Sequence, residues 1–314
     1  MRALFILATL VFSLASQAQE FPQRGPVEIT CLFPAGSSAD VTARMLAEGM
    51  SNSLGQKVLV VNRPGAGGAI GYKHAASQKP DGYSVVWNSN SISTTYHSGQ
   101  LPFDYKAFDP VARVLLESVV IAVKADASWK NLGQFVQDLK SRGKAISIGH
   151  SGVGSHTHIS LAAFLHAASV QATEVPFGAS QVIPSLLGGH VDAVVQFPGA
   201  LAAPLKQNQV RLLATLTTAR DGALPDVPTA RELGYDVALD AWRGIAVPHG
   251  TPAAVIARLE SAIRIATESA EFRKQSGHLG VRPAFLPAAE FGERIARYDR
   301  AIARQMQLIG LKKN

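Results

Sequence analysis

The sequence predicts an α/β protein of two lobes, each a mostly parallel sheet flanked by helices, with a ligand cleft between the lobes. Three observations predict this fold class. The chain has 314 residues, and chains of this length typically form about two domains. Short apolar strands alternate with glycine-rich loops and helices, which is the pattern of right-handed βαβ units. The alternation occurs twice, in two successive parts of the chain.

The first 18 residues have the features of a secretory signal peptide. Arg2 gives a positive start, Ala3 to Ala15 is almost wholly apolar, and Ser16–Ala18 offers small residues at the cleavage spacing. The apolar run is too short to span a membrane, and no later stretch reaches the ~18 apolar residues that a span needs. We therefore expect cleavage near Ala18 and export of the mature chain.

The first lobe is expected to begin with two strand–loop–helix units followed by a third strand. Apolar residues at helical spacing follow the first strand and stop at Gly55, and Pro80–Gly82 marks a turn before the third strand. The expected elements are a strand at 27–33, a helix from 41 that ends before 55, a strand at 57–61, a helix at 69–76 and a strand at 83–87.

A second series and a helical end follow. Strands are expected at 119–123, 146–148, 191–195, 211–216 and 244–247, with helices at 132–139 and 157–168. Thr251–Pro252 is a favourable N-cap and first-turn pair for the closing helices. Because these helices are expected to return to the first lobe, lobe 1 comprises 19–120 and 241–314, and lobe 2 comprises 121–240. Two crossings are the geometry of a hinge.

Three glycine-rich loops, at 34–40, 62–68 and 149–155, each follow a strand and open a helix. Ligands of open α/β sheets bind at this edge. Helix N-termini present N–H groups without acceptors and a partial positive charge, and glycine lets a ligand approach the backbone. The loops therefore predict an anion site, although Ser37 and Asp40 also fit a capping box that needs no ligand.

Other segments are expected to complete the cleft. The polar run Asn88–Ser93 either orients a ligand or is an ordinary solvated loop. Phe177 and Phe197 either cover an apolar ligand body or pack internally. Arg243 lies at the second crossing, where it is a ligand counter-charge, a hinge residue or a surface residue. The candidate ligand-binding residues are Phe33, Ala35, Gly36, Ser37, Ser38, Asp40, Gly65, Ala66, Gly67, Gly68, Asn88, Ser89, Ser151, Gly154, Ser155, His156, Phe177, Gly178, Ala179 and Phe197.

The same loops match other kinds of site only in part. Gly65–Gly68 begins like a dinucleotide-binding loop but lacks its glycine spacing and the acid after the next strand. Ser151 is a candidate hydrolase nucleophile with His150 or His156, but the nucleophile elbow lacks its final glycine. His156 and His158 diverge on a helix, unlike paired zinc ligands. We expect no cofactor and no metal, and a secreted serine hydrolase using Ser151 is the alternative function.

The distribution of charge argues against nucleic-acid binding, and the single cysteine argues against a disulfide. The formal net charge is +7, but the basic residues are scattered rather than gathered into the stripe that nucleic-acid binding requires. A mild positive field suits an anionic solute. Cys31 is the only cysteine, so no internal disulfide holds the fold, and its place in an apolar run predicts a buried thiol.

An ordered set of short motifs resembles the Bug receptors, the TctC-like periplasmic binding components of tripartite tricarboxylate transporters. The motifs are Phe33–Asp40, Leu54–Gln56, Val60–Gly68, Pro80–Tyr83, Gly152–Ser155, Val175–Gly178, Leu187–Asp192, Leu224–Thr229 and Trp242–Gly244. The resemblance implies a type II-like periplasmic binding protein that captures a small di- or tricarboxylate or an aromatic acid without changing it chemically. It also implies capture by residues 35–38 and 65–68, with 151–156 and 177–179 selecting the remainder of the ligand.

The resemblance has departures that concern the ligand. Ser37 stands where the family has a second glycine, Ala39 stands where it has threonine, and Pro176–Gly178 is shorter than the family's Pro–Tyr–Lys/Arg–Gly. These changes leave the ligand open, including an unusual carboxylate. The implied partners are the membrane permease subunits of a tripartite transporter. A sensor that presents its solute to a signalling kinase is a further alternative, and we expect a monomer.

Overall fold

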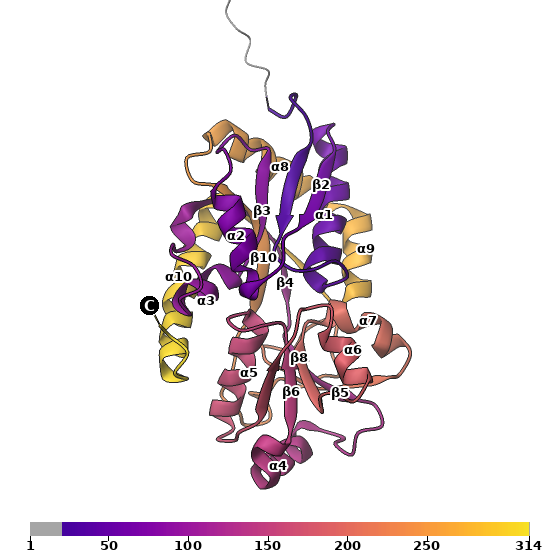
Figure 1. The fold of residues 1–314 in the computed structure, drawn as a ribbon. Helices are drawn as coiled ribbons and strands as arrows, with labels where there is room; N and C mark the ends of the chain where they lie inside the picture. Colours follow the sequence, from indigo (N-terminus) through magenta and orange to yellow (C-terminus); the bar gives the residue numbers. More distant parts are fainter. Residues whose placement is uncertain (1–20, 314) are drawn as a thin grey trace, which may run out of the picture.

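Two β-sheets form the centres of two lobes in the computed structural model, which describes residues 21–313. Figure 1 shows one lobe above the other, with the first and last parts of the chain together in the upper lobe and the middle of the chain in the lower lobe. The predicted signal peptide, residues 1–18, lies outside the described residues.

The sheet of the upper lobe consists of β1 (Val27–Cys31), β2 (Val58–Asn62), β3 (Ser84–Ser89), β4 (Phe108–Glu117), β10 (Ala241–Pro248) and β11 (Arg282–Pro287). The strand order is β11-β4-β10-β3-β1-β2. β1 pairs in parallel with β2 and β3. β10 lies antiparallel between β3 and β4, and β11 is antiparallel to β4.

Helices cover this sheet and bury a large apolar core that includes Trp87 and Phe291. Gly244 on β10 allows the close packing of the last helix, because a Cβ there would lie 2.6 Å from the Phe291 ring. Within residues 21–313, no helix combines the length and the apolar composition of a bilayer span. The helices are α1 (Ser38–Leu54), η1 (Ala66–Gly68), α2 (Ala69–Ala76), α3 (Ser91–His97), η2 (Tyr105–Ala107), α8 (Ala253–Glu268), α9 (Ala270–Leu279) and α10 (Ala288–Leu308).

The lower lobe contains β5 (Val120–Lys124), β6 (Ser147–His150), β7 (Thr173–Pro176), β8 (Ala193–Gln196) and β9 (Val210–Thr215), in the order β7-β6-β8-β5-β9. Apolar clusters pack on this sheet, one around Phe135 and Phe164 and the other around Val182 and Leu201. The helices are α4 (Leu132–Arg142), η3 (Gly143–Ala145), α5 (His156–Ala167), α6 (Val182–Leu187) and α7 (Pro198–Lys206).

Both sheets are mixed, whereas the sequence predicts mostly parallel pairing. The parallel pairs belong to the strand–loop–helix units, such as β1 with β2 and β6 with β7. The antiparallel pairs involve the strands next to the lobe crossings: β5 is antiparallel to β8 and β9, and β10 is antiparallel to β3 and β4. A strand that enters directly from the other lobe has no crossover helix to make it parallel.

Two connections join the lobes. β4 leads through Ser118 and Val119 into β5, and the chain returns through residues 216–240 into β10. Because β4 and β10 are paired, with Ala241 opposite Glu117, the two connections leave the upper sheet next to each other. The last helix makes a further contact between the lobes, because Ile302 and Met306 of α10 form a buried cluster with Ile159 of α5.

The strands β7 and β11 and the helices α6 and α7 were not predicted from the sequence. Three further differences concern β4, α3 and α8. β4 is a ten-residue strand that the sequence reasoning did not predict. Part of the expected polar loop after β3 is helical, since α3 begins at Ser91. The N-cap of α8 is Pro252 rather than Thr251, because the Thr251 hydroxyl donates to Pro248 O at 2.8 Å instead of capping the helix.

Candidate functional site

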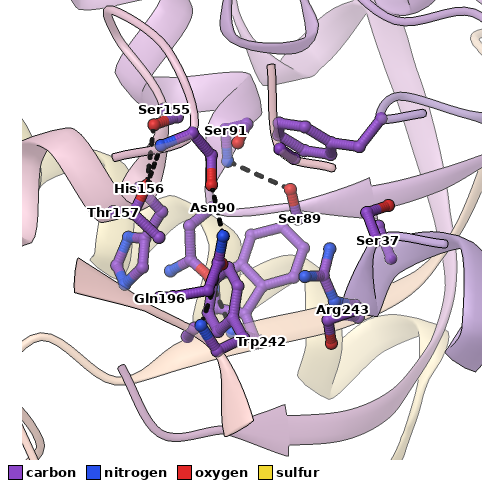
Figure 2. Close-up of a pocket in the computed structure, with 17 residues that line it drawn as sticks. Ser37, Ser89, Asn90, Ser91, Ser155, His156, Thr157, Gln196, Trp242 and Arg243 are labelled. Atoms are coloured by element: carbon purple, nitrogen blue, oxygen red, sulfur yellow. Dashed lines mark hydrogen bonds between the residues drawn. The ribbon is translucent and has the colours of Figure 1, made fainter. Parts of the chain in front are cut away.

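A small pocket lies between the lobes, next to the two connections, and we call it the inner pocket (Figure 2). Only about 20 Å³ is open to the centre of a water molecule, which is room for one or two waters. Arg243 is the one lining side chain with a permanent charge. The lining residues are Phe33, Ser37, Ser38, Ala39, Ser89, Asn90, Ser91, Ser151, Ser155, His156, Thr157, Ala179, Gln196, Phe197, Ala241, Trp242 and Arg243.

A larger groove of about 470 Å³ adjoins the inner pocket and shares Phe33, Ser151 and Ala179 with it. We call it the outer groove. Glycine-rich loops from both lobes line it, and none of its lining side chains carries a charge. The lining residues are Phe33, Pro34, Pro64, Gly65, Ala66, Gly67, Gly68, Gln100, Ser151, Gly152, Val153, Phe177, Gly178, Ala179 and Ser180.

The upper wall of the inner pocket is the first turn of α1. Ser37 is the N-cap, and its hydroxyl oxygen accepts from Asp40 N at 3.3 Å and donates to Pro34 O at 2.6 Å. The predicted capping box is therefore present on the Ser37 side. The Asp40 carboxylate accepts from Gly36 N at 3.0 Å, one residue before the position that a capping box uses.

Asp40 fixes the two loops of the upper lobe rather than lining the pocket. Its carboxylate accepts from Asn62 Nδ2 at 2.9 Å, and the same amide nitrogen donates to Phe33 O at 2.9 Å. Arg44 Nη2 lies 2.8 Å from Asp40 Oδ1, the same carboxylate oxygen that accepts from Asn62. Burial opposes ionisation, but the hydrogen bonds from Arg44 and Asn62 outweigh it and hold the pKa of Asp40 below its usual value.

The lower wall is the first turn of α5. Ser155 is the N-cap and accepts from His158 N at 3.3 Å. The Thr157 hydroxyl accepts from Ser151 N at 3.0 Å and lies 3.0 Å from the Ser155 hydroxyl. These bonds hold the loop after β6 against the helix, so that Ser155, His156 and Thr157 at the start of α5 line the pocket.

His156 lies at the pocket edge but is fixed by contacts from both lobes. Its Nδ1 is 3.1 Å from Tyr298 OH of α10, and its Nε2 is 3.2 Å from Leu239 O. Burial lowers the pKa of His156 to about 4. The imidazole is therefore neutral at pH 7 and contributes a polar contact rather than a charge.

The start of α7 closes the lower side. Gln196 Nε2 donates to the Ser151 hydroxyl at 3.1 Å, and Gln196 Oε1 accepts from Phe197 N at 2.9 Å. Gly199, in the first turn of α7, lies against α1, since a Cβ there would be 2.9 Å from the Ser38 hydroxyl. The N-termini of α1, α5 and α7 thus converge on one pocket from both lobes.

The floor of the inner pocket is formed where β10 enters the upper sheet. Asn90 Oδ1 accepts from Trp242 N at 2.6 Å, and Asn90 Nδ2 donates to Asp240 O at 3.2 Å. Arg243 Nε donates to the fully buried carboxylate of Glu117 on β4. Glu117 therefore lies directly beneath the floor, paired with the pocket's one charged side chain.

The lobes contact each other at the outer groove. Gly67 has a φ of +64°, and a Cβ there would lie 2.7 Å from Val153 O and 3.1 Å from Ser155 N of the lower lobe. Gln100 Nε2 also donates to Val153 O, at 3.0 Å. Glycine is therefore required at position 67 by its backbone conformation and by the neighbouring lobe.

The structure distributes the sequence candidates over three places. Candidates on the inner pocket are Phe33, Ser37, Ser38, Ser89, Ser151, Ser155, His156, Ala179 and Phe197. Candidates on the outer groove alone are Gly65, Ala66, Gly67, Gly68, Phe177 and Gly178. Those on neither surface are Ala35, Gly36, Asp40, Asn88 and Gly154. The last group contains residues that support the loops from behind: Asn88 Oδ1, for example, accepts from Tyr72 OH at 2.8 Å.

Several lining residues were not among the sequence candidates. Four of them follow candidates within two positions, and two of these four belong to the polar run 88–93. Three lie at the second crossing, where Arg243 was one of the residues with several possible roles. Gln196 carried a more specific signal, because it is a polar residue at the carboxyl end of a buried strand. The residues concerned are Ala39, Asn90, Ser91, Thr157, Gln196, Ala241, Trp242 and Arg243.

The geometry at Ser151 is not that of a nucleophile beside a base. Its hydroxyl accepts from Gln196, and His150 Nδ1 lies 3.2 Å from Gly152 O. His150 is stacked on His158, with the ring centroids 4.5 Å apart. Within residues 21–313, no cluster of His, Cys, Asp and Glu side chains could hold a metal ion.

Comparison with known proteins assigns the chain to one family. The model of the tripartite tricarboxylate transporter family receptor matches residues 42–309. BugT of Bordetella pertussis is 30% identical over 84% of this chain and 82% of its own length.

Solved structures agree in fold. The periplasmic binding protein BugD is 26% identical, with a TM-score of 0.88 over 93% of this chain and 99% of its own. MatC from Rhodopseudomonas palustris, solved with bound malate, is 26% identical, with a TM-score of 0.81 over 90% of this chain and 100% of its own.

Proposed function

The chain belongs to the tripartite tricarboxylate transporter receptor family, and from this premise we propose that it is an exported periplasmic receptor that closes its two lobes around a small carboxylate. The predicted signal peptide at residues 1–18 supports export. The periplasmic binding protein BugD, similar over nearly the whole chain, supports the location.

The convergence of helix N-termini at the inner pocket is the observation that carries this proposal. α1 comes from the upper lobe, and α5 and α7 come from the lower lobe. The first-turn N–H groups of a helix have no acceptor within the helix, and its dipole favours negative charge. A carboxylate held between these ends receives donors from both lobes, which is what an anion receptor requires.

The malate-bound structure of MatC supports the ligand class. Malate is a small carboxylic acid, and MatC aligns with this chain over both lobes. The inner pocket and outer groove here offer hydroxyl, amide and backbone donors to such a molecule, with Phe33 and Phe197 beside its apolar part.

We propose that closure of the two lobes signals to the transporter that the ligand is bound. The inner pocket has room for the one or two waters that a carboxylate group would replace, and the lobes touch at Gly67 and Val153, so the lobes must part to admit an acid and then close around it. We place the boundary of the movement near residues 120 and 241, with 19–120 and 241–314 as one body and 121–240 as the other. A ligand closes the lobes only through contacts that it makes better in the closed form. The closed form then docks on the permease subunits of a tripartite transporter.

Isothermal titration of the mature protein tests the proposal. The ligands are succinate, malate, adipate and benzoate, each beside its amide, which has a similar shape but no charge. We expect at least one acid to bind with a Kd in the micromolar range, about −8 kcal/mol, and its amide to bind far more weakly. Equal binding of acids and amides, or binding of none of the acids, would contradict the proposal.

A parallel assay separates a receptor from a hydrolase. The purified protein is incubated with ester and amide substrates, and Ser151→Ala is the matched variant. We expect no turnover by either protein. Turnover by the wild type that Ser151→Ala abolishes would identify an enzyme instead.

A further inference from the structure

Arg243 is a buried charge that the fold brings to the inner pocket. Only 3% of the residue is exposed, and it lies on β10, where the returning chain enters the upper sheet. Its Nε donates to Glu117, and its guanidinium carbon lies 4.9 Å from the centre of the Phe197 ring. Figure 2 shows the guanidinium directed into the space below Ser37 and Ser89.

The other end of the guanidinium has no partner in the described protein. Within residues 21–313, the terminal nitrogens Nη1 and Nη2 of Arg243 donate to no oxygen, and the Nε bond to Glu117 is the one hydrogen bond of this side chain. Because Arg243 lines the inner pocket, these charged donors open onto a space that water or a ligand can occupy, which indicates a site for an acceptor. The acceptor must be able to enter the inner pocket.

We propose that Arg243 holds one carboxylate of the ligand, with Nη1 and Nη2 donating to its two oxygens. This deepens the proposed function and rests on it. The carboxylate would lie beside the first turn of α1, where the N–H groups of Ser38 and Ala39 add donors. Arginine suits this role because its planar fork matches the geometry of a carboxylate.

Glu117 positions Arg243 without cancelling its attraction for an anion. The Glu117 carboxylate accepts from the Ser38 hydroxyl and from Arg243 Nε, and these bonds fix the plane of the guanidinium. A ligand carboxylate at the Nη end would lie about 4 Å from the guanidinium carbon but about 8 Å from Glu117. By Coulomb's law the attraction is then about twice the repulsion. The N-termini of α1, α5 and α7 add to the attraction.

The arrangement also predicts how the ligand is oriented. Arg243 is the one permanently charged side chain on the inner pocket, and the outer groove has none. One carboxylate is therefore expected to point inward to Arg243. The rest of the molecule would extend past Phe33 to the outer groove, where glycine-loop amides and neutral side chains meet it. The preferred ligand class is an acid with one deeply held carboxylate and a polar, weakly discriminated outer end.

Two variants distinguish ligand binding by Arg243 from a role in which Arg243 only neutralises Glu117. Arg243→Gln alone leaves Glu117 buried without its partner and endangers the fold, so the main variant is the double substitution Glu117→Gln with Arg243→Gln. It removes both charges and retains similar shapes. Glu117→Gln alone keeps Arg243 and removes only the competing carboxylate. Each protein is titrated with succinate, malate, adipate and benzoate and with their amides, after its fold has been checked by circular dichroism.

The affinity for the acid should change in opposite directions in the two variants. The double variant should bind the best acid about 10- to 100-fold more weakly than the wild type, because a charged hydrogen-bonded pair is lost. Its binding of the matching amide should be unchanged. Glu117→Gln should bind the same acid more tightly, because Arg243 has lost its internal anion.

A purely structural role for Arg243 predicts different affinities. If the double variant binds the acid like the wild type, or if Glu117→Gln binds it more weakly, the proposal is overturned and the receptor function stands. If the wild type binds none of the acids, the proposed function and this proposal both fail.

Discussion

Alanine at position 67 should obstruct lobe closure while leaving the open protein folded. The Cβ would lie 2.7 Å from Val153 O, about 0.6 Å closer than an ordinary carbon–oxygen contact of about 3.3 Å. The atom that it meets is backbone of the other lobe, so no side-chain rotation relieves the overlap. The lobes must therefore close less far in this variant.

The cost should appear as lost affinity. Overfilling a packed contact typically costs about 1–3 kcal/mol, and here it falls only on the closed form. A ligand that requires the closed form would then bind about 5- to 150-fold more weakly. The positive φ adds a second cost of about 1–2 kcal/mol for any side chain, but this cost is equal in the open and closed forms and affects stability alone.

Gly55→Ala is the matched control. Gly55 ends α1 with φ 66° and ψ 19°, and Gly67 has φ 64° and ψ 9°. A Cβ at Gly55 would meet nothing within 4 Å. Both variants therefore have the same backbone strain, and only Gly67→Ala has the contact between lobes.

Titration with the best acid found for the wild type, together with urea unfolding, gives the two readouts. Both variants should lose a similar free energy of unfolding, and Gly67→Ala alone should lose affinity. Wild-type affinity in Gly67→Ala, or an equal loss in Gly55→Ala, would refute the reasoning from closure.

Two further predictions concern stability. Burial lowers the pKa values of His150, His156 and His158 to about 3, 4 and 4, against about 6.5 in an unfolded chain. The free energy of unfolding should therefore be greatest above pH 6.5 and fall by about 1.4 kcal/mol per pH unit for each histidine as the pH drops toward 4. If urea unfolding gave the same free energy at pH 6.5 and pH 4.5, the imidazoles would be solvated. Gly244→Ala would push a Cβ into the backbone oxygen of Ala112 on the neighbouring strand. Thermal unfolding should therefore show a free energy of unfolding lower by about 3 kcal/mol or more. Unfolding like that of the wild type would mean that β10 and β4 are less tightly packed.

Local features of the site could be predicted because neighbours in sequence create them. The N-cap of α1 is an example: Ser37 and Asp40 are three residues apart, and their bond forms in any chain that starts a helix there. The glycine loops follow the same logic. Asn88 shows the limit, since successive strand residues point to opposite faces. Ser89 faces the inner pocket and Asn88 faces Tyr72, so period-two alternation would have selected one of them.

The pair of Arg243 and Glu117 could not be predicted in this way. The two residues are 126 positions apart, and their contact depends on the register between β10 and β4. β4 itself escaped prediction, since Pro110 and Arg113 interrupt its apolar pattern. When its partner is unknown, an arginine at a crossing between lobes fits a hinge residue, a surface residue and a ligand-binding residue equally well. Only the tertiary fold shows which of its nitrogens are occupied.

The position of the Arg243–Glu117 pair also gives the two lobes different roles in binding. Arg243, Glu117 and the start of α1 all belong to the upper lobe, so their arrangement does not depend on closure. An acid can therefore meet its counter-charge in the open form. The starts of α5 and α7 and the Phe197 ring belong to the lower lobe and reach the ligand only when the lobes approach. On this reasoning the upper lobe sets which charge is captured, and the lower lobe supplies the differential contacts without which binding would produce no closure.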